Sequence, residues 1–409
     1  MVRSHEPTSY SVATISNILG SMPAVSRFAR EILGAHRNYF GGRISFDTPD
    51  TRAVYTPNIG PAVAEPGLPE TWIRFDEQYR SNARISRFWV AEVHNAVVFP
   101  PFGIVAVDNM LLRDTIRSWT QLERLFPDVT SVALQAAMAP GGLPISTSAP
   151  TPVHRLEGLS FLLGFGMYDN YFNWTLRYAS RIGLYQAQTE AKRLLIPRLS
   201  KRYIADTLEF LGVPQQECHS IEGPVLCERL KIVSPVALGR YEISPLITDT
   251  LRGHSRVASL WRSEKKPLYI PRRNVAMRLV TNQTAVEAEL TAHGFRIFDN
   301  AAHSVQEQVK AFRNASMIVA PHGAGLSNIV YCDPDTPVIE LVPEGYDQGV
   351  TSYRSLSDLF GLSYTQLFAR EVMPDRRGNR CNSDIEIDIA ELVSTIDALR
   401  AHPVSSDSW

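Results

Sequence analysis

The strongest candidate for chemistry in this chain is the histidine of the motif PHGAG at positions 321–325. An apolar run at 317–320 precedes the motif, and a segment that can turn helical follows it. Glycines let backbone N–H groups approach a ligand closely, and the first turn of a helix carries partial positive charge. The motif therefore predicts an anion site with phosphate as the expected guest. His322 adds a proton donor or acceptor at that site.

A pair of arginines, Arg272 and Arg273, follows a second apolar run at 268–270. Guanidinium groups bind phosphate oxygens in a fixed geometry and supply positive charge without a metal ion. If this run is a strand of the same sheet, the arginines lie at its end and contribute to the same site. Asp333-Pro334-Asp335 resembles an Asp-x-Asp metal motif, but the internal proline predicts a turn instead.

The elements that must position these residues alternate between strand and helix. Capping-box patterns at Thr284-x-x-Glu287 and Ser304-x-x-Glu307 each predict a helix start. The predicted strands lie at 268–270, 295–298, 317–320, 338–342 and 362–368. This alternation predicts an α/β fold with a parallel sheet and helices on both faces. Ligands bind such sheets at the carboxyl ends of the strands, where the PHGAG motif falls.

Composition narrows the class of protein. The chain has 409 residues and a net charge of −1, so its bulk charge gives no reason to expect nucleic-acid binding. Its 4 cysteines show no metal-ligand spacing and do not predict a disulfide framework. No apolar run reaches the roughly 18 residues of a membrane span, and no signal pattern opens the chain. We expect a cytoplasmic protein, and association with the face of an inner membrane is compatible with this sequence.

The sequence between positions 269 and 346 resembles the donor half of glycosyltransferase family 61, in particular its bacterial members. The matching features are Arg272-Arg273 after a strand, Asn282, Gly294-Phe295, Glu307-Gln308, PHGAGLSN at 321–328 and VIEL at 338–341. Upstream, NYFNW at 170–174 resembles the Asn-Tyr-Phe-His-Trp segment of that family. Asn173 stands where the family has histidine, which puts any role of that histidine in acceptor activation in doubt.

The resemblance implies a GT-B-like fold, in which two Rossmann-like halves face a cleft. It implies an inverting, metal-independent hexosyl- or pentosyltransferase that takes a nucleotide-sugar as substrate and has no cofactor. The acceptor would be a glycan or another hydroxyl compound, for example in surface polysaccharide synthesis. The expected divisions are an N-terminal extension and linker at 1–85, an acceptor-side domain at 86–255, a nucleotide-sugar-binding domain at 256–370, and a C-terminal loop and helix at 371–409.

Glycosyl transfer needs a stabilised leaving diphosphate, a base for the acceptor hydroxyl and a donor held in line. We predict His322 and Asp169 as catalytic residues, with His94 and Asp108 as other candidates for the base. The predicted donor-binding residues are Arg272, Arg273, Gly323, Ala324, Gly325, Asn328, Glu340 and Glu344. Glu340 and Glu344 would accept hydrogen bonds from the donor ribose.

Two alternatives to a transferase remain open. A catalytically inactive glycan- or nucleotide-binding protein on the same fold is one, because Asn173 replaces the family histidine. A Rossmann-type oxidoreductase is the other. Against it, Asn328 stands where a dinucleotide-binding motif has its third glycine, and the glycine turn follows the third strand of its unit rather than the first. The donor sugar, the nucleotide base, the acceptor and the oligomeric state are not encoded in a recognisable motif.

Overall fold

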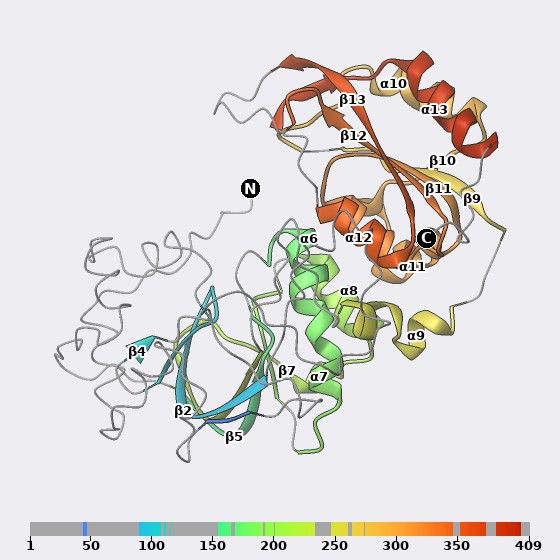
Figure 1. The fold of residues 1–409 in the computed structure, drawn as a ribbon. Helices are drawn as coiled ribbons and strands as arrows, with labels where there is room; N and C mark the ends of the chain where they lie inside the picture. The colour runs from blue at the N-terminus through green and yellow to red at the C-terminus, as the bar shows by residue number, and fades with distance from the viewer. Residues whose placement is uncertain are drawn as a thin grey trace, which may run out of the picture. The chain divides into compact units, whose positions relative to one another are not determined.

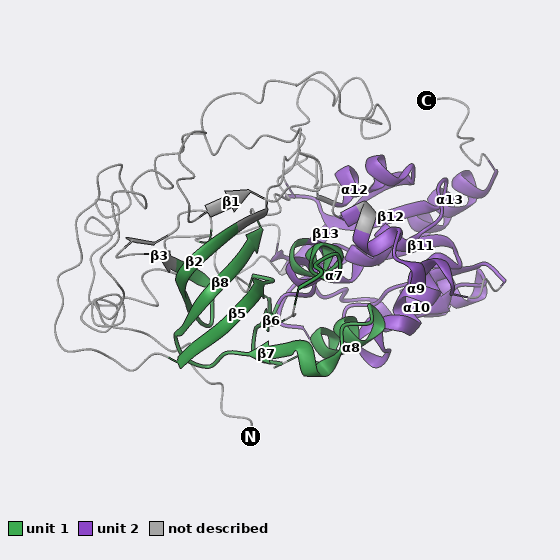
Figure 2. Ribbon diagram, turned by 90° about the horizontal axis from the view of Figure 1, so that it is seen from below, with its two compact units in different colours: residues 1–63, 87–169, 177–236 green, residues 64–86, 170–176, 237–409 purple. Residues whose placement is uncertain are grey.

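A computed structural model places the chain in two compact units (Figure 2). Unit 1 holds residues 1–63, 87–169 and 177–236, and unit 2 holds residues 64–86, 170–176 and 237–409. Asp108 and nearly all of the predicted N-terminal segment lie outside the described residues. The described residues are 44–46, 90–107, 110–111, 115, 154–164, 168–190, 193–199, 201–233, 247–260, 264–273, 275–346, 352–373 and 382–401.

Unit 1 is built on an eight-stranded mixed sheet in the order β4-β3-β2-β8-β5-β6-β7, with β1 also paired to β2. Four neighbouring strands, β8, β5, β6 and β7, run parallel, and the remaining pairs are antiparallel. The strands are β1 Ile44–Phe46, β2 Val90–Phe99, β3 Ile104–Val107, β4 Met110–Leu111, β5 His154–Leu162, β6 Leu194–Ile196, β7 Cys218–Ser220 and β8 Val225–Val233.

Helical segments of unit 1 connect its parallel strands. They are η4 Ala179–Arg181, α7 Ile182–Gln186, α8 Arg202–Phe210 and η5 Gln215–Glu217. Ahead of them, α6 Tyr171–Asn173 belongs to unit 2, and the π-helix η3 Trp174–Tyr178 spans the boundary between the units. The core of unit 1 includes fully buried Val93, Val98 and Leu230 from its central strands. Each such side chain stabilises the fold by roughly 1.5–3 kcal/mol.

Unit 2 contains a six-stranded sheet in the order β10-β9-β11-β12-β13-β14, and all pairs except β13 with β14 are parallel. The strands are β9 Lys266–Tyr269, β10 Arg296–Ile297, β11 Ala315–Pro321, β12 Pro337–Pro343, β13 Ser363–Met373 and β14 Asp384–Glu386. The chain moves outward from β9 to β10 and then back past β9 to β11. The connections after β9 and after β11 thus leave in opposite directions, which makes the carboxyl ends of these strands a topological switch point where ligands bind.

Helices cover both faces of this sheet (Figure 1). Alternate residues of β11, β12 and β13 pack against α10 Gln283–Ala292 and α13 Ile389–Ala401, which bury Val286, Leu290, Leu392 and Ile396. On the opposite face lie α11 Val305–Arg313 and α12 Ser352–Phe360. Shorter segments complete the unit: η6 Ile247–Arg252, α9 Ser255–Ala258, η7 Asn300–Ala302 and η8 Ala324–Tyr331. The predicted α/β class is confirmed, and two such units agree with the expected GT-B-like fold.

The starts of α11 and α10 show where local sequence determines the N-cap of a helix and where it does not. Ser304 and Glu307 form the predicted capping box at α11. The one predicted at Thr284 is wrong, because the N-cap of α10 is Asn282 and the helix begins at Gln283. The Asn282 side chain instead bonds both backbone polar groups of Ile387, at 2.8 Å and 3.0 Å. Tertiary contacts with Ile387, rather than the local capping-box pattern, thus accompany the start of α10. Within the described residues, no helix has the length and hydropathy of a membrane span.

Candidate active site

The PHGAG motif forms the turn between β11 and η8, at the switch point of unit 2. The His322 N–H donates to the Leu341 carbonyl at 2.8 Å, so contact with β12 continues just past the end of β11. The first bond of η8 runs from the Leu326 N–H to the Gly323 carbonyl, at 3.0 Å. The N–H groups of Ala324 and Gly325 therefore precede the helical ladder, as donors do at the start of a helix. The segment after the motif is helical as predicted, but of the 3₁₀ type.

Space, rather than backbone conformation, requires glycine in this turn. Gly323 has an extended backbone that any residue can adopt, with φ 171° and ψ 169°. A Cβ atom at Gly323 would lie 1.8 Å from Nη1 of Arg272. A Cβ atom at Gly325 would lie 3.0 Å from Nδ2 of Asn300 and 3.3 Å from Cγ2 of Ile270. The first glycine therefore makes room for an arginine that follows the neighbouring strand β9, as well as for a ligand.

Arg272 is a cation with carbonyl partners. Its guanidinium donates to the His322 carbonyl at 3.3 Å and to the Met277 carbonyl at 3.2 Å. Its Nε is buried without a hydrogen-bond partner among the described residues, and none of their carboxylates forms an ion pair with it. Burial, and next the charge of Arg278, lower the pKa of Arg272 to about 10. The side chain remains charged at neutral pH, and an anion at the turn would relieve the cost of burying that charge.

Arg273, the second predicted arginine, points away from this group. It forms an ion pair with Glu287 of α10 at 2.5 Å, and its side chain is 42% exposed. The structure brings Arg272 to the glycine turn and leaves Arg273 on the α10 side. Glu287 is thereby an ion-pair partner rather than a helix cap.

His322 is held by a buried carboxylate. Its Nδ1 hydrogen-bonds Oε1 of Glu340, which lies on β12 and is 0% exposed, and the Tyr364 hydroxyl donates to Oε2 of the same carboxylate. A ring nitrogen that faces a carboxylate oxygen carries the proton, so the neutral ring keeps its Nε2 lone pair free to accept one. Glu340 was predicted to bind the donor ribose. In the structure, both carboxylate oxygens of Glu340 form hydrogen bonds with protein groups, which favours a role in orienting His322.

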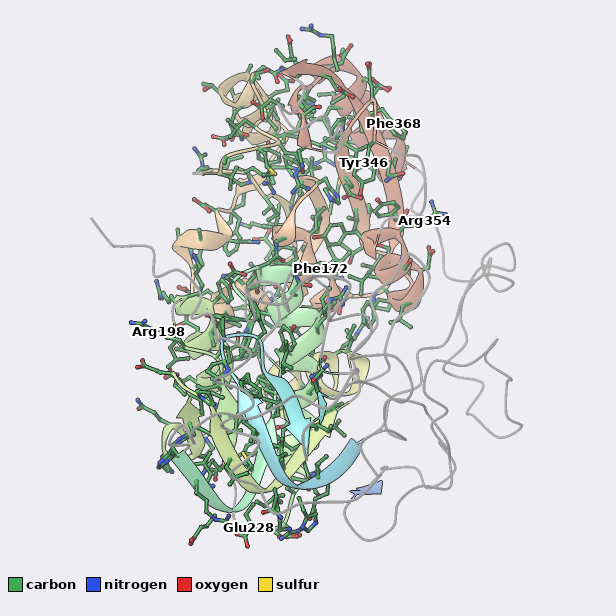
Figure 3. The ribbon with its side chains drawn as sticks, turned by 90° about the vertical axis from the view of Figure 1, so that its left-hand side faces the viewer. Phe172, Arg198, Glu228, Tyr346, Arg354 and Phe368 are labelled. Carbon is green, nitrogen blue, oxygen red and sulfur yellow. The ribbon has the colours of Figure 1, made fainter. Side chains whose placement is uncertain are left out.

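Aromatic side chains of unit 2 surround the histidine. Tyr346 and Tyr353 lie 4.9 Å and 5.5 Å from its ring, measured between centroids. The Tyr353 hydroxyl donates to the Gly323 carbonyl at 2.7 Å, and Phe172 meets the Tyr353 ring edge-on at 5.6 Å. Figure 3 labels Phe172, which lies on α6, and Tyr346, which follows β12. The imidazole is 17% exposed, so these rings restrict the directions from which a substrate can reach it.

Asn328 lies inside unit 2 rather than at its surface. Its Oδ1 accepts from the Tyr171 hydroxyl at 2.7 Å, and its Nδ2 donates to Gln308 at 2.9 Å. Gln308 in turn donates to the Asn300 carbonyl, and the Asn300 side chain donates to the Gly325 carbonyl at 3.2 Å. Asn328 is 0% exposed, so its amide is not presented to a nucleotide-sugar. Its hydrogen bonds, which continue through Gln308 and Asn300, instead support the PHGAG turn.

The segment that resembles the Asn-Tyr-Phe-His-Trp motif packs within unit 2. Burial raises the pKa of Tyr171 to about 12, so its hydroxyl is a neutral hydrogen-bond donor at neutral pH. Asn173, which replaces the family histidine, is buried. Asp169, predicted as a catalytic residue, is exposed and ends a segment of unit 1. His94, another candidate base, is also in unit 1 and contacts Glu92 at 3.2 Å.

Two other predicted positions have clear placements. Ala324 is half-buried at the start of η8. Glu344 is exposed just beyond the end of β12, where its N–H bonds the Ala369 carbonyl at 2.9 Å. Both remain accessible to a ligand at the carboxyl edge of the sheet. Glu344 therefore stays a candidate for hydrogen bonds to donor hydroxyl groups.

The Asp-x-Asp sequence forms the predicted turn. Asp333 pairs with Lys265 at 3.1 Å, and its carbonyl accepts from the Thr336 N–H at 3.3 Å. Asp335 has a left-handed backbone with φ 64°. In the part of the chain that the structure describes, no cluster of histidine, cysteine and acidic residues suits a metal ion.

Sequence inspection missed Tyr364, Tyr353 and Arg278. One available signal was Glu340 itself, since a carboxylate within the apolar run 338–342 must find partners when its strand is buried. The identity of those partners depends on the strand register, which pairs Ala320 with Glu340 and so brings His322 close to it. Arg278 had no local signal, because its surroundings come from elements distant in sequence.

Comparison with known proteins agrees with this geometry. The family model described as Glycosyltransferase 61 matches residues 171–339. A stretch of 43 residues is 40% identical to beta-1,2-xylosyltransferase RCN11 of Oryza sativa subsp. japonica, and it covers 10% of this chain and 8% of that protein. The matched region contains Arg272 and His322, whereas Glu340 and Tyr364 follow its end. Over residues 171–339 the chain is therefore similar to glycosyltransferase family 61.

Proposed function

We propose that this protein is a glycosyltransferase that moves a sugar from a nucleotide-sugar donor to a hydroxyl group of an acceptor, with inversion at the sugar carbon. The observation that carries the proposal is the Arg272 cation, which has no carboxylate partner among the described residues and packs on the PHGAG turn at the switch point of a parallel sheet. Arg272 can bind an anion, and His322, which Glu340 orients, can accept a proton. The two groups together fit a reaction in which a diphosphate leaves and a proton is transferred. The family match supports the same reaction class.

The chemistry assigns separate tasks to the two groups. The acceptor oxygen forms a bond to the sugar carbon while the bond from that carbon to the donor phosphate breaks, and the nucleoside diphosphate leaves with the bonding electrons. Arg272 and the N–H groups at the start of η8 stabilise the charge that develops on the leaving group. His322 takes the acceptor proton on Nε2, and Glu340 stabilises the imidazolium that results. Asp169 in unit 1 remains a second candidate for the proton acceptor.

Guanidinium charge at the turn makes a metal ion unnecessary for the departure of the diphosphate, so we propose a metal-independent transferase with no cofactor. For the donor, the partial likeness to a xylosyltransferase makes a pentose nucleotide the first candidate. A glycan acceptor, a place in surface polysaccharide synthesis and a cytoplasmic site of action belong to the same proposal.

The test measures release of nucleoside diphosphate from a panel of nucleotide-sugars, with and without a chelator, and with simple glycosides as acceptors. The wild type should turn over at least one donor, and the chelator should leave that rate unchanged. Arg272→Met should remove donor binding, while Arg296→Met, which removes an exposed arginine of β10 in the same unit, should not. Equal activity of the wild type and a folded Arg272→Met variant would contradict the proposed site.

A catalytically inactive binding protein is the second candidate, and Asn173 in place of the family histidine favours it. It predicts that a nucleotide-sugar binds tightly in calorimetry but is neither hydrolysed nor transferred to any acceptor. Restoring the family residue with Asn173→His would then produce turnover, whereas an active wild type would exclude this candidate.

A further inference from the structure

A second arginine, Arg278, is held next to Arg272 by an unusual backbone. Its φ of 58° lies in the left-handed region, which residues other than glycine rarely adopt. The segment is fixed on both sides: the Arg278 N–H bonds the Asn382 carbonyl at 3.3 Å, and the Leu279 N–H bonds Asp384 at 2.7 Å. Glycine would be the ordinary residue here, so a strained arginine calls for an explanation in terms of its side chain.

The two arginines are brought together by the fold. Nη2 of Arg272 bonds the carbonyl of Met277, the residue directly before Arg278, at 3.2 Å. Each arginine has a buried Nε with no hydrogen-bond partner among the described residues. The charge of Arg278 also contributes to lowering the pKa of Arg272, and Asp384 and Tyr353 act in the opposite direction.

The charges around this pair do not balance. Within the described residues neither arginine forms an ion pair with a carboxylate, and Asp384, the carboxylate that acts on Arg272, already accepts the Leu279 N–H through its Oδ1. Two like charges with unsatisfied donors repel one another until an anion is bound between them. A monophosphate presents one phosphoryl group to both guanidinium groups, whereas a diphosphate offers each group its own phosphate.

We propose that Arg278 is a second donor-binding residue, and that with Arg272 it forms a two-cation clamp that selects a diphosphate over a monophosphate. The inference rests on the proposed function, since the diphosphate is that of the nucleotide-sugar and of the nucleotide released. Arg272 contacts the glycine turn directly, and Arg278 supplies the second charge. The strained backbone at Arg278 is then the cost of directing its side chain toward the same anion.

The test uses Arg278→Gly in the full chain. Glycine adopts the φ of 58° without strain, so the variant should fold with an unchanged or higher melting temperature. Isothermal titration calorimetry would measure the affinities of matched nucleoside mono- and diphosphates and of inorganic pyrophosphate and phosphate. Arg278→Met and Arg278→Lys provide independent variants, and Arg296→Met controls for the loss of one positive charge from unit 2.

The wild type should bind the nucleoside diphosphate at least tenfold more tightly than the monophosphate, a difference of about 1.4 kcal/mol. Arg278→Gly and Arg278→Met should abolish that preference and leave monophosphate affinity unchanged within about twofold. Arg278→Lys should keep part of the preference. A full preference in Arg278→Gly, or an equal loss of both affinities, would overturn the clamp while the proposed function stands. If the wild type bound no nucleoside diphosphate, the proposed function would fail first.

Discussion

Replacing Glu340 by glutamine tests whether the buried carboxylate and His322 work as a couple. The amide has nearly the same shape, and its oxygen can still accept the Nδ1 proton of the imidazole. The ring therefore keeps its orientation and its available Nε2. What disappears is a negative charge that is fully buried beside the ring. The substitution separates the electrostatic effect of Glu340 from its effect on geometry.

The size of the effect follows from the environment of that charge. A hydrogen bond to a charged group contributes about 1.5–3 kcal/mol, compared with about 1 kcal/mol for a neutral pair. If the charge stabilises the imidazolium formed during transfer by about 1–2 kcal/mol beyond the neutral hydrogen bond that glutamine retains, its loss lowers kcat roughly 5- to 30-fold. The KM for the donor should stay within about twofold, because Glu340 faces His322 and Tyr364 rather than the ligand.

The assay is steady-state release of nucleoside diphosphate with the donor identified by the panel, at saturating acceptor. Thermal unfolding of Glu340→Gln checks that the fold survives, which is expected because a neutral isostere replaces a buried charge. Glu289→Gln, on the opposite face of the sheet on α10, is the matched control. A folded Glu340→Gln variant with kcat within about threefold of wild type would refute the reasoning. A rise in KM with unchanged kcat would place Glu340 in donor binding, as the sequence suggested.

Three further predictions follow from the contacts at the turn. Arg272→Met should weaken donor binding at least tenfold while leaving the unfolding free energy of the unliganded protein unchanged or higher. Burial, and next the charge of Arg278, lower the pKa of Arg272 from 12.5 to about 10, a penalty on the order of 3 kcal/mol that the substitution removes. A clear loss of unfolding free energy in denaturant titration would contradict this reasoning. Gly323→Ala should displace the guanidinium, because its Cβ would lie 1.8 Å from Nη1; calorimetry should show lost donor affinity, and retained affinity would mean that Arg272 is not the anion contact. Tyr364→Phe removes one donor to Glu340 and should destabilise the fold by about 1–2 kcal/mol; kcat should fall less than in Glu340→Gln, and a larger fall would assign the catalytic effect to the hydroxyl.

The sequence determined the α/β class, the order of strands and helices in unit 2, and the place of the PHGAG turn at a strand end. These features depend on local information. Apolar runs of strand length, the Ser304-x-x-Glu307 capping box and glycine stops such as Gly294, with φ 81°, act over a few residues. The order of the predicted strands also placed the glycine turn after the third strand of its unit. A dinucleotide-binding turn follows the first strand, so this order argued against a dinucleotide site. The structure confirms that order.

Only the tertiary structure decided which side chains meet. The partner of His322 is Glu340 because β11 and β12 pair in one particular register, and a shift of one residue would turn that carboxylate to the other face. Arg272 rather than Arg273 meets the turn, because Arg273 pairs with Glu287 of α10. The backbone at Arg278 is fixed by contacts with a segment more than a hundred residues away. Such contacts are set by packing and register across the whole sheet, and local sequence does not encode them.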